Sequence, residues 1–550
     1  MISVRLYGDD NGHLSKIKKR SGNIKKLGKI VALLLAATLV LSLVACGDDK
    51  DTGDKTLKIF GDVGSSDGYS VLDEKIVNQF KEKTGVTVEL EYVASSGYLE
   101  KLQLMLASGE YPDAALFPST TVQAYVDSVN NGIVVELNKY LTEENAPNLM
   151  KYTYETAWEG VKFFGDDRIM AIPRTSIIRN EGIGVRADWM KKIGFGEVLE
   201  RENHQVTADE FKEIMKRMTF NDPDGNGKND TLATSCWADD STKQFGPLEF
   251  TRGFYGDYGW YKYEGDSYTY MMPQYSKKTN IFKNQLQYTQ DAFKAGYLDK
   301  DGPSLKKQDV IDRFNTGKYG IFPSFAGHIK SNEKNLTSFY GQKCQTNENY
   351  VDYIYAEDSN GVVAGNGYYK PMWGQWCVFT SCKDPNMFVQ FCDFILSDDI
   401  WKMVYNGEEG VTYNMVDGYR VPIDVPSGER ARVCQLPQGI VRKAGDAAYF
   451  TGSETLEKEM VYYKPYLDKA FEISQKTLLT QLDNGFVPSV STDTAFVNYQ
   501  STMAEKITKI CAGSLPVSEY DSVLDGWYKN GGQQYVEEMN EYIAKTHKDK

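Results

Sequence analysis

The sequence predicts an α/β fold with a parallel sheet flanked by helices. Segments with the alternation or the apolar content of strands occur at 57–62, 86–93 and 114–117. Between them lie segments with apolar residues at helical spacing, 71–80 and 99–106. Strands that alternate with helices in this way pair in parallel, because each helix returns the chain to the start of the next strand. A length of 550 residues exceeds one compact core, which indicates two or three lobes.

Residues 1–45 have the organisation of a bacterial lipoprotein signal peptide. A basic stretch from Lys16 to Lys29 precedes an uncharged run, 30–45, that is short for a membrane-spanning helix. The run ends in Leu43-Val-Ala-Cys-Gly47, which resembles a lipobox, so lipidation of Cys46, including palmitate, is predicted. Within residues 46–56, the charged stretch that follows Cys46 is expected to be a flexible tether. We therefore expect a protein anchored to the extracytoplasmic face of the cell membrane; the alternative is a signal anchor in which Cys46 is incidental.

The part of the chain that follows this leader is acidic. Residues 1–45 contain eight Lys or Arg and two Asp, so the remainder has 54 basic and 74 acidic residues and a formal charge of −20. A surface of this sign repels phosphate groups. Nucleic acid is therefore not expected as a partner.

Two loops form the first candidate mouth of a binding site. Ligands of open α/β sheets bind at the carboxyl ends of strands. These ends are followed here by 61–68, which is rich in Gly, Ser and Asp, and by 118–121. Ser119 and Thr120 are candidate donors to a ligand, and turn capping is their alternative role.

Residues 222–230 have the spacing of the first part of an EF-hand calcium loop. Oxygen side chains stand at positions 1, 3, 5 and 9, a glycine at position 6 and a backbone carbonyl at position 7. The candidate ligands are Asp222, Asp224, Asn226, Lys228 through its carbonyl, and Asp230. Position 12 is Ala233, so the usual bidentate Glu is missing. A structural Ca²⁺ site is predicted, with a plain Asp/Gly/Asn turn as the alternative.

Three aromatic clusters are candidates for the binding of a sugar. Sugars have apolar C–H faces and polar edges, so their sites combine aromatic rings with planar polar groups. The candidates are Trp237, Asp239, Asp240, Tyr255, Trp260, Trp373 and Trp376. For each tryptophan, packing in a core is the alternative.

The segment Leu106-Ala-Ser-Gly-Glu-Tyr-Pro-Asp113 has the form LASGxxPD, and further segments with recognisable motifs follow in order at 131–141, 185–194, 314–322 and 407–413. In this order, the segments resemble the signatures of the family 1 extracellular solute-binding proteins, the maltose-binding-like group. The nearest subgroup is the large, Firmicutes-type lipoproteins of oligosaccharide importers.

This resemblance implies a two-lobed, periplasmic-binding-protein-like fold of class II with hinge-crossing strands. The implied first lobe is 57–173 plus 366–408, and the implied second lobe is 176–360 plus 410–550. Arg174 follows the first crossing and is a candidate to fork onto ligand oxygens, with a surface or lobe-bridging ion pair as its alternative.

The implied function is capture of an oligosaccharide by hinge closure, followed by delivery to the permease subunits of an ABC transporter. A monomer is expected, and catalysis is not: the chain has no GxSxG or HExxH motif, and only His204, His328 and His547 follow the leader. A peptide-binding or adhesive surface lipoprotein is one alternative. A surface glycosidase is another, because the many Asp and Glu residues can supply a carboxylate pair.

Overall fold

The computed structural model describes most of the chain beyond residue 54. The described residues are 55–62, 71–93, 95–163, 166–175, 182–237, 246, 248–323, 329–341, 349–364, 372–423, 440, 442, 460–479 and 481–547. The chain divides into a unit of residues 1–55, of which only Lys55 is described, and a unit of residues 56–550, which contains the fold. The predicted signal peptide, Cys46 and nearly all of the tether lie outside the described residues.

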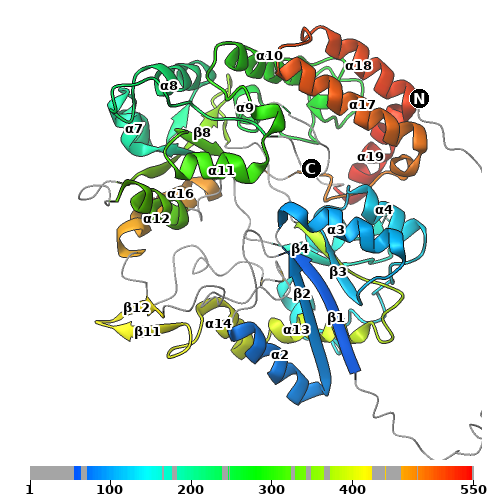
Figure 1. Ribbon diagram of the computed structural model, residues 1–550. Helices are drawn as coiled ribbons and strands as arrows, with labels where there is room; N and C mark the ends of the chain where they lie inside the picture. The colour runs from blue at the N-terminus through cyan, green and yellow to red at the C-terminus, as the bar shows by residue number, and fades with distance from the viewer. Residues whose placement is uncertain are drawn as a thin grey trace, which may run out of the picture. The chain divides into compact units, whose positions relative to one another are not determined.

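A five-stranded sheet with the order β2-β1-β3-β10-β4 forms the first layer (Figure 1). Its strands are β1 (Lys55–Asp62), β2 (Val86–Val93), β3 (Ala114–Phe117), β4 (Ile172–Thr175) and β10 (Met372–Val378). β1 and β3 are parallel, as predicted, but β10 is antiparallel to both β3 and β4. The sheet is therefore mixed rather than parallel throughout. β10 is not part of the βαβ succession, because the chain returns to this sheet only after it has formed a second one.

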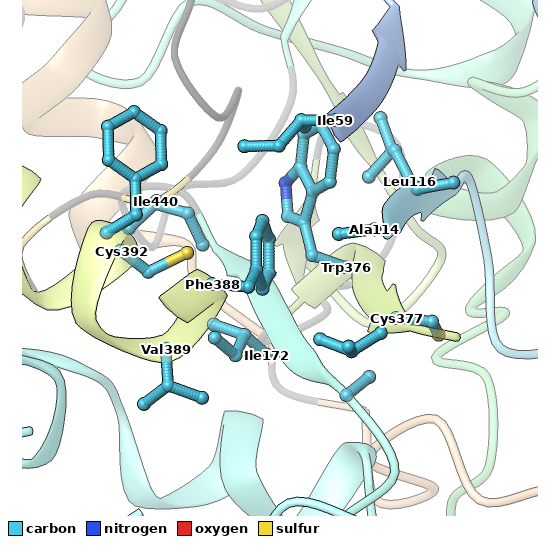
Figure 2. Packing of buried hydrophobic residues seen from close by; sticks show 14 of the residues in the cluster. Ile59, Ala114, Leu116, Ile172, Trp376, Cys377, Phe388, Val389, Cys392 and Ile440 are labelled. Carbon is cyan, nitrogen blue, oxygen red and sulfur yellow. The ribbon is translucent and has the colours of Figure 1, made fainter. Parts of the chain in front are cut away.

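Helices from both halves of the chain bury their apolar sides in the first core. They are α2 (Val71–Thr84), α3 (Ser95–Ser108), α4 (Gln123–Asn130), α5 (Pro147–Tyr152), α6 (Glu155–Gly160), α13 (Asn386–Ile395) and α14 (Asp398–Asn406). Figure 2 shows the centre of this core, where Trp376 of β10 lies beside Ile59 of β1 and Phe388 of α13. The ring centroids of Trp376 and Phe388 are 6.0 Å apart. Burial of these large side chains fixes the sheet that carries the candidate site.

A second sheet has the order β6-β8-β5-β7, and β9 pairs with β8. Its strands are β5 (Ile183–Arg186), β6 (Gln205–Val206), β7 (Ile321–Pro323), β8 (Val351–Glu357) and β9 (Val363–Ala364). The helices that pack in its two cores are α7 (Ala187–Lys192), α8 (Ala208–Phe220), α9 (Thr251–Tyr255), α10 (Ile281–Lys294), α11 (Lys307–Asn315), α12 (Ile329–Tyr340), α16 (Met460–Lys476), α17 (Thr494–Cys511), α18 (Glu519–Trp527) and α19 (Gln533–Thr546). Short 3-10 helices occur at Gly196–Glu200, Pro273–Tyr275, Gly302–Ser304 and Ser489–Thr492, and a π-helical turn at Tyr528–Gly532.

Helix α8 illustrates how the local sequence sets an element. Thr207 caps its N-terminus by accepting a hydrogen bond from the Glu210 N–H, and the Glu210 carboxylate accepts one from the Thr207 N–H. This capping box satisfies donors that a helix start leaves open. The buried side of α8 carries Phe211, Ile214, Met215 and Met218. None of the described helices is long and apolar enough to cross a membrane.

The C-terminal part of the chain contributes to the first core and to the two cores beside the second sheet. We call these the second core, which includes α8, α10 and α17, and the third core, which includes α11, α12 and α16. Ile440 and Val487 are buried in the first core, although the family resemblance implied that 410–550 belongs to the second lobe. Within a few residues of Val487, Leu482 and Phe486 are buried in the second core. The hairpin of β11 (Tyr413–Val416) and β12 (Tyr419–Pro422) is a separate two-stranded sheet. The exact lobe boundaries stay a prediction.

Candidate functional site

One edge of the first sheet gathers the ends of several strands. β1 ends at Asp62, β3 at Phe117 and β4 at Thr175. β10 begins at this edge, because it is antiparallel to its neighbours and Met372 pairs with Thr175. We call this the strand-end edge. Ligands of open α/β sheets bind outside the carboxyl ends of the strands, so this edge is the first place to look for a site.

Trp373 projects from β10 at the strand-end edge. It is 44% exposed, whereas the other residues of β10 are buried. The pairing of β10 with β4 shifts register between Met372 and Gln375, which marks a bulge. A bulge re-aims the side chains beside it. A β-carbon on Gly374 would lie 2.8 Å from the carbonyl oxygen of Phe117, so the backbone at this bulge leaves room for glycine only.

Arg174 of β4 lies against one face of the Trp373 indole. Its guanidinium carbon is 3.3 Å from the ring centroid, and Arg174 itself is 3% exposed. The indole Nε1 donates a hydrogen bond to the carbonyl of Thr175, at 3.3 Å. Because one face is covered, the exposure of Trp373 belongs to the other face and to the ring edges. An indole with one supported and one open face is a suitable platform for the C–H face of a sugar.

The guanidinium is also paired with Asp62. Arg174 Nη1 lies 3.8 Å from Asp62 Oδ2, and Asp62 is also buried. Burial lowers the pKa of Arg174 to about 10, against the opposing effect of Asp62. The guanidinium therefore stays protonated at neutral pH. Asp62 lies in the candidate loop 61–68 but was not among the predicted ligand contacts, and its position as the last residue of a predicted strand was the available signal.

The loop 118–121 lies at the same edge, but its hydroxyl groups bond to other groups of the protein. Ser119 Oγ accepts a hydrogen bond from the Thr121 N–H and lies 2.9 Å from Thr121 Oγ1. Thr120 is buried, and its hydroxyl donates to the carbonyl of Gly485 at 2.9 Å. The structure thus places Ser119 in a turn, as in the turn-capping alternative raised from the sequence, and gives Thr120 a different role, a hydrogen bond to a distant part of the chain.

Two of the predicted site tryptophans lie in cores. Trp260 is 1% exposed and is packed in the second core, with its ring centroid 6.1 Å from that of Tyr275. Trp376 is fully buried in the first core. A fully buried indole has no face to offer a solute. We therefore correct the assignment of Trp260 and Trp376 from ligand contacts to core residues.

The other candidates come from the part of the chain that forms the second sheet. Trp237 is half-buried against the third core, and Lys307 Nζ lies 5.6 Å from its ring centroid. Tyr255 is half-buried and packs edge-on against Tyr288 at 6.2 Å, and burial raises the pKa of its hydroxyl. Asp239 and Asp240 lie outside the described residues.

The loop after α9 contains further aromatic side chains that the sequence analysis did not select. The Tyr258 hydroxyl donates to Asp358 Oδ2 at 2.6 Å, and burial together with this carboxylate raises its pKa. Tyr261 packs edge-on against Tyr258 at 5.7 Å and is 44% exposed. The glycines on either side of Tyr258, both with positive φ, were the signal that this ring stands on a turn.

The predicted calcium loop closes on itself through hydrogen bonds. The Asp222 carboxylate accepts from the N–H groups of Asn226 and Gly227, at 3.0 and 2.9 Å. The Asn226 amide donates to Asp224 Oδ2 at 2.8 Å and to Asp230 Oδ1 at 3.1 Å. Burial, and then the neighbouring carboxylates of Asp222 and Asp230, raise the pKa of Asp224.

These hydrogen bonds within the loop affect how well its oxygen atoms could surround a Ca²⁺ ion. Within the described residues, no group of three or more His, Cys, Asp or Glu converges as metal ligands do. The Asn226 amide instead bridges Asp224 and Asp230. The donors are the hard oxygen atoms that Ca²⁺ prefers, and their negative charges are close enough to raise a pKa. The residue types fit the ion, while the geometry is that of a turn held by its own amides. Lys228 would contribute only its backbone carbonyl to a Ca²⁺ site. Its backbone N–H donates a hydrogen bond to Asn226 Oδ1 at 2.8 Å.

Comparison with known proteins gives three kinds of match. A family model described as "Bacterial extracellular solute-binding protein" matches residues 64–369. The polygalacturonan/rhamnogalacturonan-binding protein YtcQ of Bacillus subtilis is 22% identical over 486 residues, which cover 85% of this chain and 88% of YtcQ. Lipoprotein LipO of the same species is 21% identical over 535 residues, which cover 94% of this chain and 98% of LipO.

Among solved structures, the ABC-transporter substrate-binding protein FusA of Streptococcus pneumoniae, in complex with kestose, matches with a TM-score of 0.63. The match has 15% identity and covers 90% of this chain and 100% of FusA. A structure of a FusA EF-hand mutant in complex with fructo-nystose matches with a TM-score of 0.62. At such identities the likeness concerns the fold alone, and it confirms the predicted two-lobed α/β fold class.

Proposed function

The chain belongs to the family of bacterial extracellular solute-binding proteins, as its sequence signatures indicated, and on that premise we propose that it captures an oligosaccharide for an ABC importer. The observation that carries the proposal is the indole platform of Trp373 at the strand-end edge. It stands where ligands bind to such sheets, one face is supported by Arg174, and the ring remains 44% exposed.

The chemistry of this platform suits a sugar. The open face of an indole attracts the weakly positive C–H groups on one side of a pyranose or furanose ring. Polar groups nearby then select the positions of the hydroxyl groups. The names of YtcQ and FusA refer to binding of a polysaccharide and of kestose, which supports a carbohydrate over a peptide for this chain.

The proposed mechanism is capture without chemistry. A solute that contacts both lobes binds the closed state more tightly than the open state and so shifts the population towards closure. The closed form then docks on the permease and releases its cargo unchanged. The partners are thus a saccharide and the membrane subunits of the importer.

A binding screen tests the proposal directly. Melting temperature is measured with oligogalacturonides, rhamnogalacturonan fragments, kestose and a pool of short peptides, and each solute is recovered to detect turnover. We expect a saccharide to raise the melting temperature and to be recovered intact. A shift with peptides alone would favour the peptide-binding alternative, and cleavage of the glycan would favour the glycosidase.

A matched pair of variants locates the site. Trp373→Ala is expected to weaken binding of the saccharide found in the screen by at least about tenfold, equivalent to about 1.4 kcal/mol. Phe220→Ala is the control, because Phe220 is 48% exposed and ends α8, a helix that packs in the second core and not against the first sheet. Equal affinities of the two variants would remove Trp373 from the site.

The lipid anchor and the calcium site belong to the same proposal. The lipobox-like segment around Cys46 and the similarity to lipoprotein LipO support lipidation on the outer face of the membrane. The spacing of the acidic residues in 222–230 and the EF-hand named for FusA support a structural Ca²⁺ ion. Asp222, Asp224, Asn226, Asp230 and the Lys228 carbonyl would hold it. Its charge would neutralise the crowded carboxylates and hold the loop closed.

A further inference from the structure

We propose that Arg174 is a positioning residue, which holds the Trp373 ring in its stacking orientation before a ligand arrives and does not itself contact the ligand. The inference rests on the proposed function, because it concerns how the binding platform is built. It replaces the interpretation from the sequence, in which the Arg174 guanidinium would fork onto ligand oxygens.

Arg174 is buried against the indole of Trp373. A guanidinium that binds a ligand must reach the solvent-exposed side of the site, but Arg174 is 3% exposed. The indole of Trp373 covers it at 3.3 Å, and Asp62 of β1 lies 3.8 Å from its Nη1. Arg174 therefore lies between a carboxylate and the underside of the ring. A ligand on the open face would meet the indole and not the guanidinium.

The Trp373 side chain is held at several points. The guanidinium contacts one face, the Nε1–H donates to the Thr175 carbonyl, and the bulge at Gly374 sets the direction of the side chain. An exposed aromatic side chain with fewer restraints would occupy several rotamers and would lose that freedom on binding. Ordering such a side chain costs affinity, and pre-ordering it removes this cost.

Arginine suits position 174 better than lysine would. A guanidinium is planar and weakly hydrated, so it stacks flat on an indole while its nitrogen atoms keep a carboxylate partner. A lysine ammonium is a compact, strongly hydrated charge that cannot cover a ring face in this way. Lysine at position 174 should therefore keep the charge opposite Asp62 but lose part of the support under the ring.

The protein contains a matched control. Arg186 is 1% exposed, its guanidinium carbon lies 4.7 Å from the Trp189 ring centroid, and it pairs with Asp188 at 2.6 Å. This second arginine–tryptophan–aspartate group lies on β5 and α7, and Trp189 is buried. Arg186→Met thus removes a buried, stacked guanidinium without touching the strand-end edge.

The test uses the full chain in mild detergent, with all eight tryptophans replaced by 5-fluorotryptophan. The fluorine resonance of residue 373 is assigned by its loss in Trp373→Phe. We expect one narrow line in the unsubstituted protein, broadening or splitting of that line in Arg174→Met, a partial effect in Arg174→Lys, and no change in Arg186→Met. An unaltered line in Arg174→Met would overturn the proposal. If Arg174→Met does not fold, Asp62→Asn gives the same readout, because it loosens the guanidinium and leaves the arginine in place.

Affinity gives the second readout, with a rhamnogalacturonan oligosaccharide and kestose as the probes. Arg174→Met is expected to bind about 3- to 10-fold more weakly, and Arg186→Met within twofold of the unsubstituted protein. A disturbed fluorine line with unchanged affinity would refute positioning as a cause of binding strength. If neither probe binds the unsubstituted protein, the saccharide proposal is in question, while the fluorine line still decides whether Arg174 orients the ring.

Discussion

Gly160 offers a sharp test of how the C-terminal segment 481–490 is seated. Gly160 ends α6, and a β-carbon there would overlap the carbonyl oxygen of Asn484 and lie 2.6 Å from Met372 Sδ. The methionine can move, but the carbonyl belongs to the backbone. In the same segment Val487 is buried in the first core and Phe486 stacks on Tyr542, with ring centroids 4.3 Å apart. The segment is thus held on both sides and cannot yield easily.

The expected cost of Gly160→Ala follows from this geometry. Forcing one extra methyl group into a packed position costs about 1–3 kcal/mol, and here the upper part of this range applies because a backbone group must shift. Gly97→Ala is the matched control, since Gly97 lies in α3 and a β-carbon there meets no atom within 4 Å. Replacement of a helical glycine in open space should stabilise by about 0.5–1 kcal/mol.

Equilibrium unfolding in urea measures both variants against the unsubstituted chain. We expect the midpoint to fall for Gly160→Ala and to rise slightly for Gly97→Ala, with similar slopes. The reasoning would fail if Gly160→Ala unfolded at the midpoint of the unsubstituted protein. Such a result would mean that segment 481–490 does not lie against α6 and the start of β10.

Three further predictions concern acid–base behaviour, metal and membrane. Burial raises the pKa of Asp352 to about 7, so the folded state keeps a proton that the unfolded chain releases above about pH 4. The contribution of this group to the free energy of unfolding is therefore fully present at low pH and is lost as the pH rises to about 7. Asp352→Asn should remove that part of the pH dependence of the melting temperature, and an unchanged profile would contradict it. Millimolar Ca²⁺ should raise the melting temperature after treatment with a chelator, but not in Asp224→Ala, and a variant that responds like the parent would argue against the site. Cys46→Ser should move the protein from the membrane fraction to the medium, and its continued retention would contradict lipid anchoring.

Local patterns in the sequence were sufficient for the elements of the first βαβαβ unit. The predicted strands 86–93 and 114–117 have the bounds of β2 and β3, and the predicted strand 57–62 lies within β1. The predicted helix 71–80 lies within α2, which extends to Thr84. These segments were predictable because each repeats its apolar residues at the period of its own backbone, and that period depends only on near neighbours.

The two tryptophans of β10 show what a local pattern does not decide. Trp373 and Trp376 stand three residues apart in one strand, yet one is 44% exposed and the other is fully buried. Residues three apart in a strand point to opposite faces, but both faces of β10 are buried apart from Trp373, which stands next to the start of the strand at the strand-end edge. That edge is set by the pairing of β10 with β4, a strand almost two hundred residues earlier in the chain, so near neighbours carry no signal for it.

The sequence by itself determined the family, the α/β class, the lipobox-like leader and the candidate residues, because these depend on composition, period and spacing. The tertiary structure alone decided which candidates share a site. It inserted β10 between β3 and β4, set Arg174 between Asp62 and Trp373, and directed the Thr120 hydroxyl to the Gly485 carbonyl. Each of these contacts joins residues distant along the chain, and the free energy that selects them comes from burial shared by the whole core.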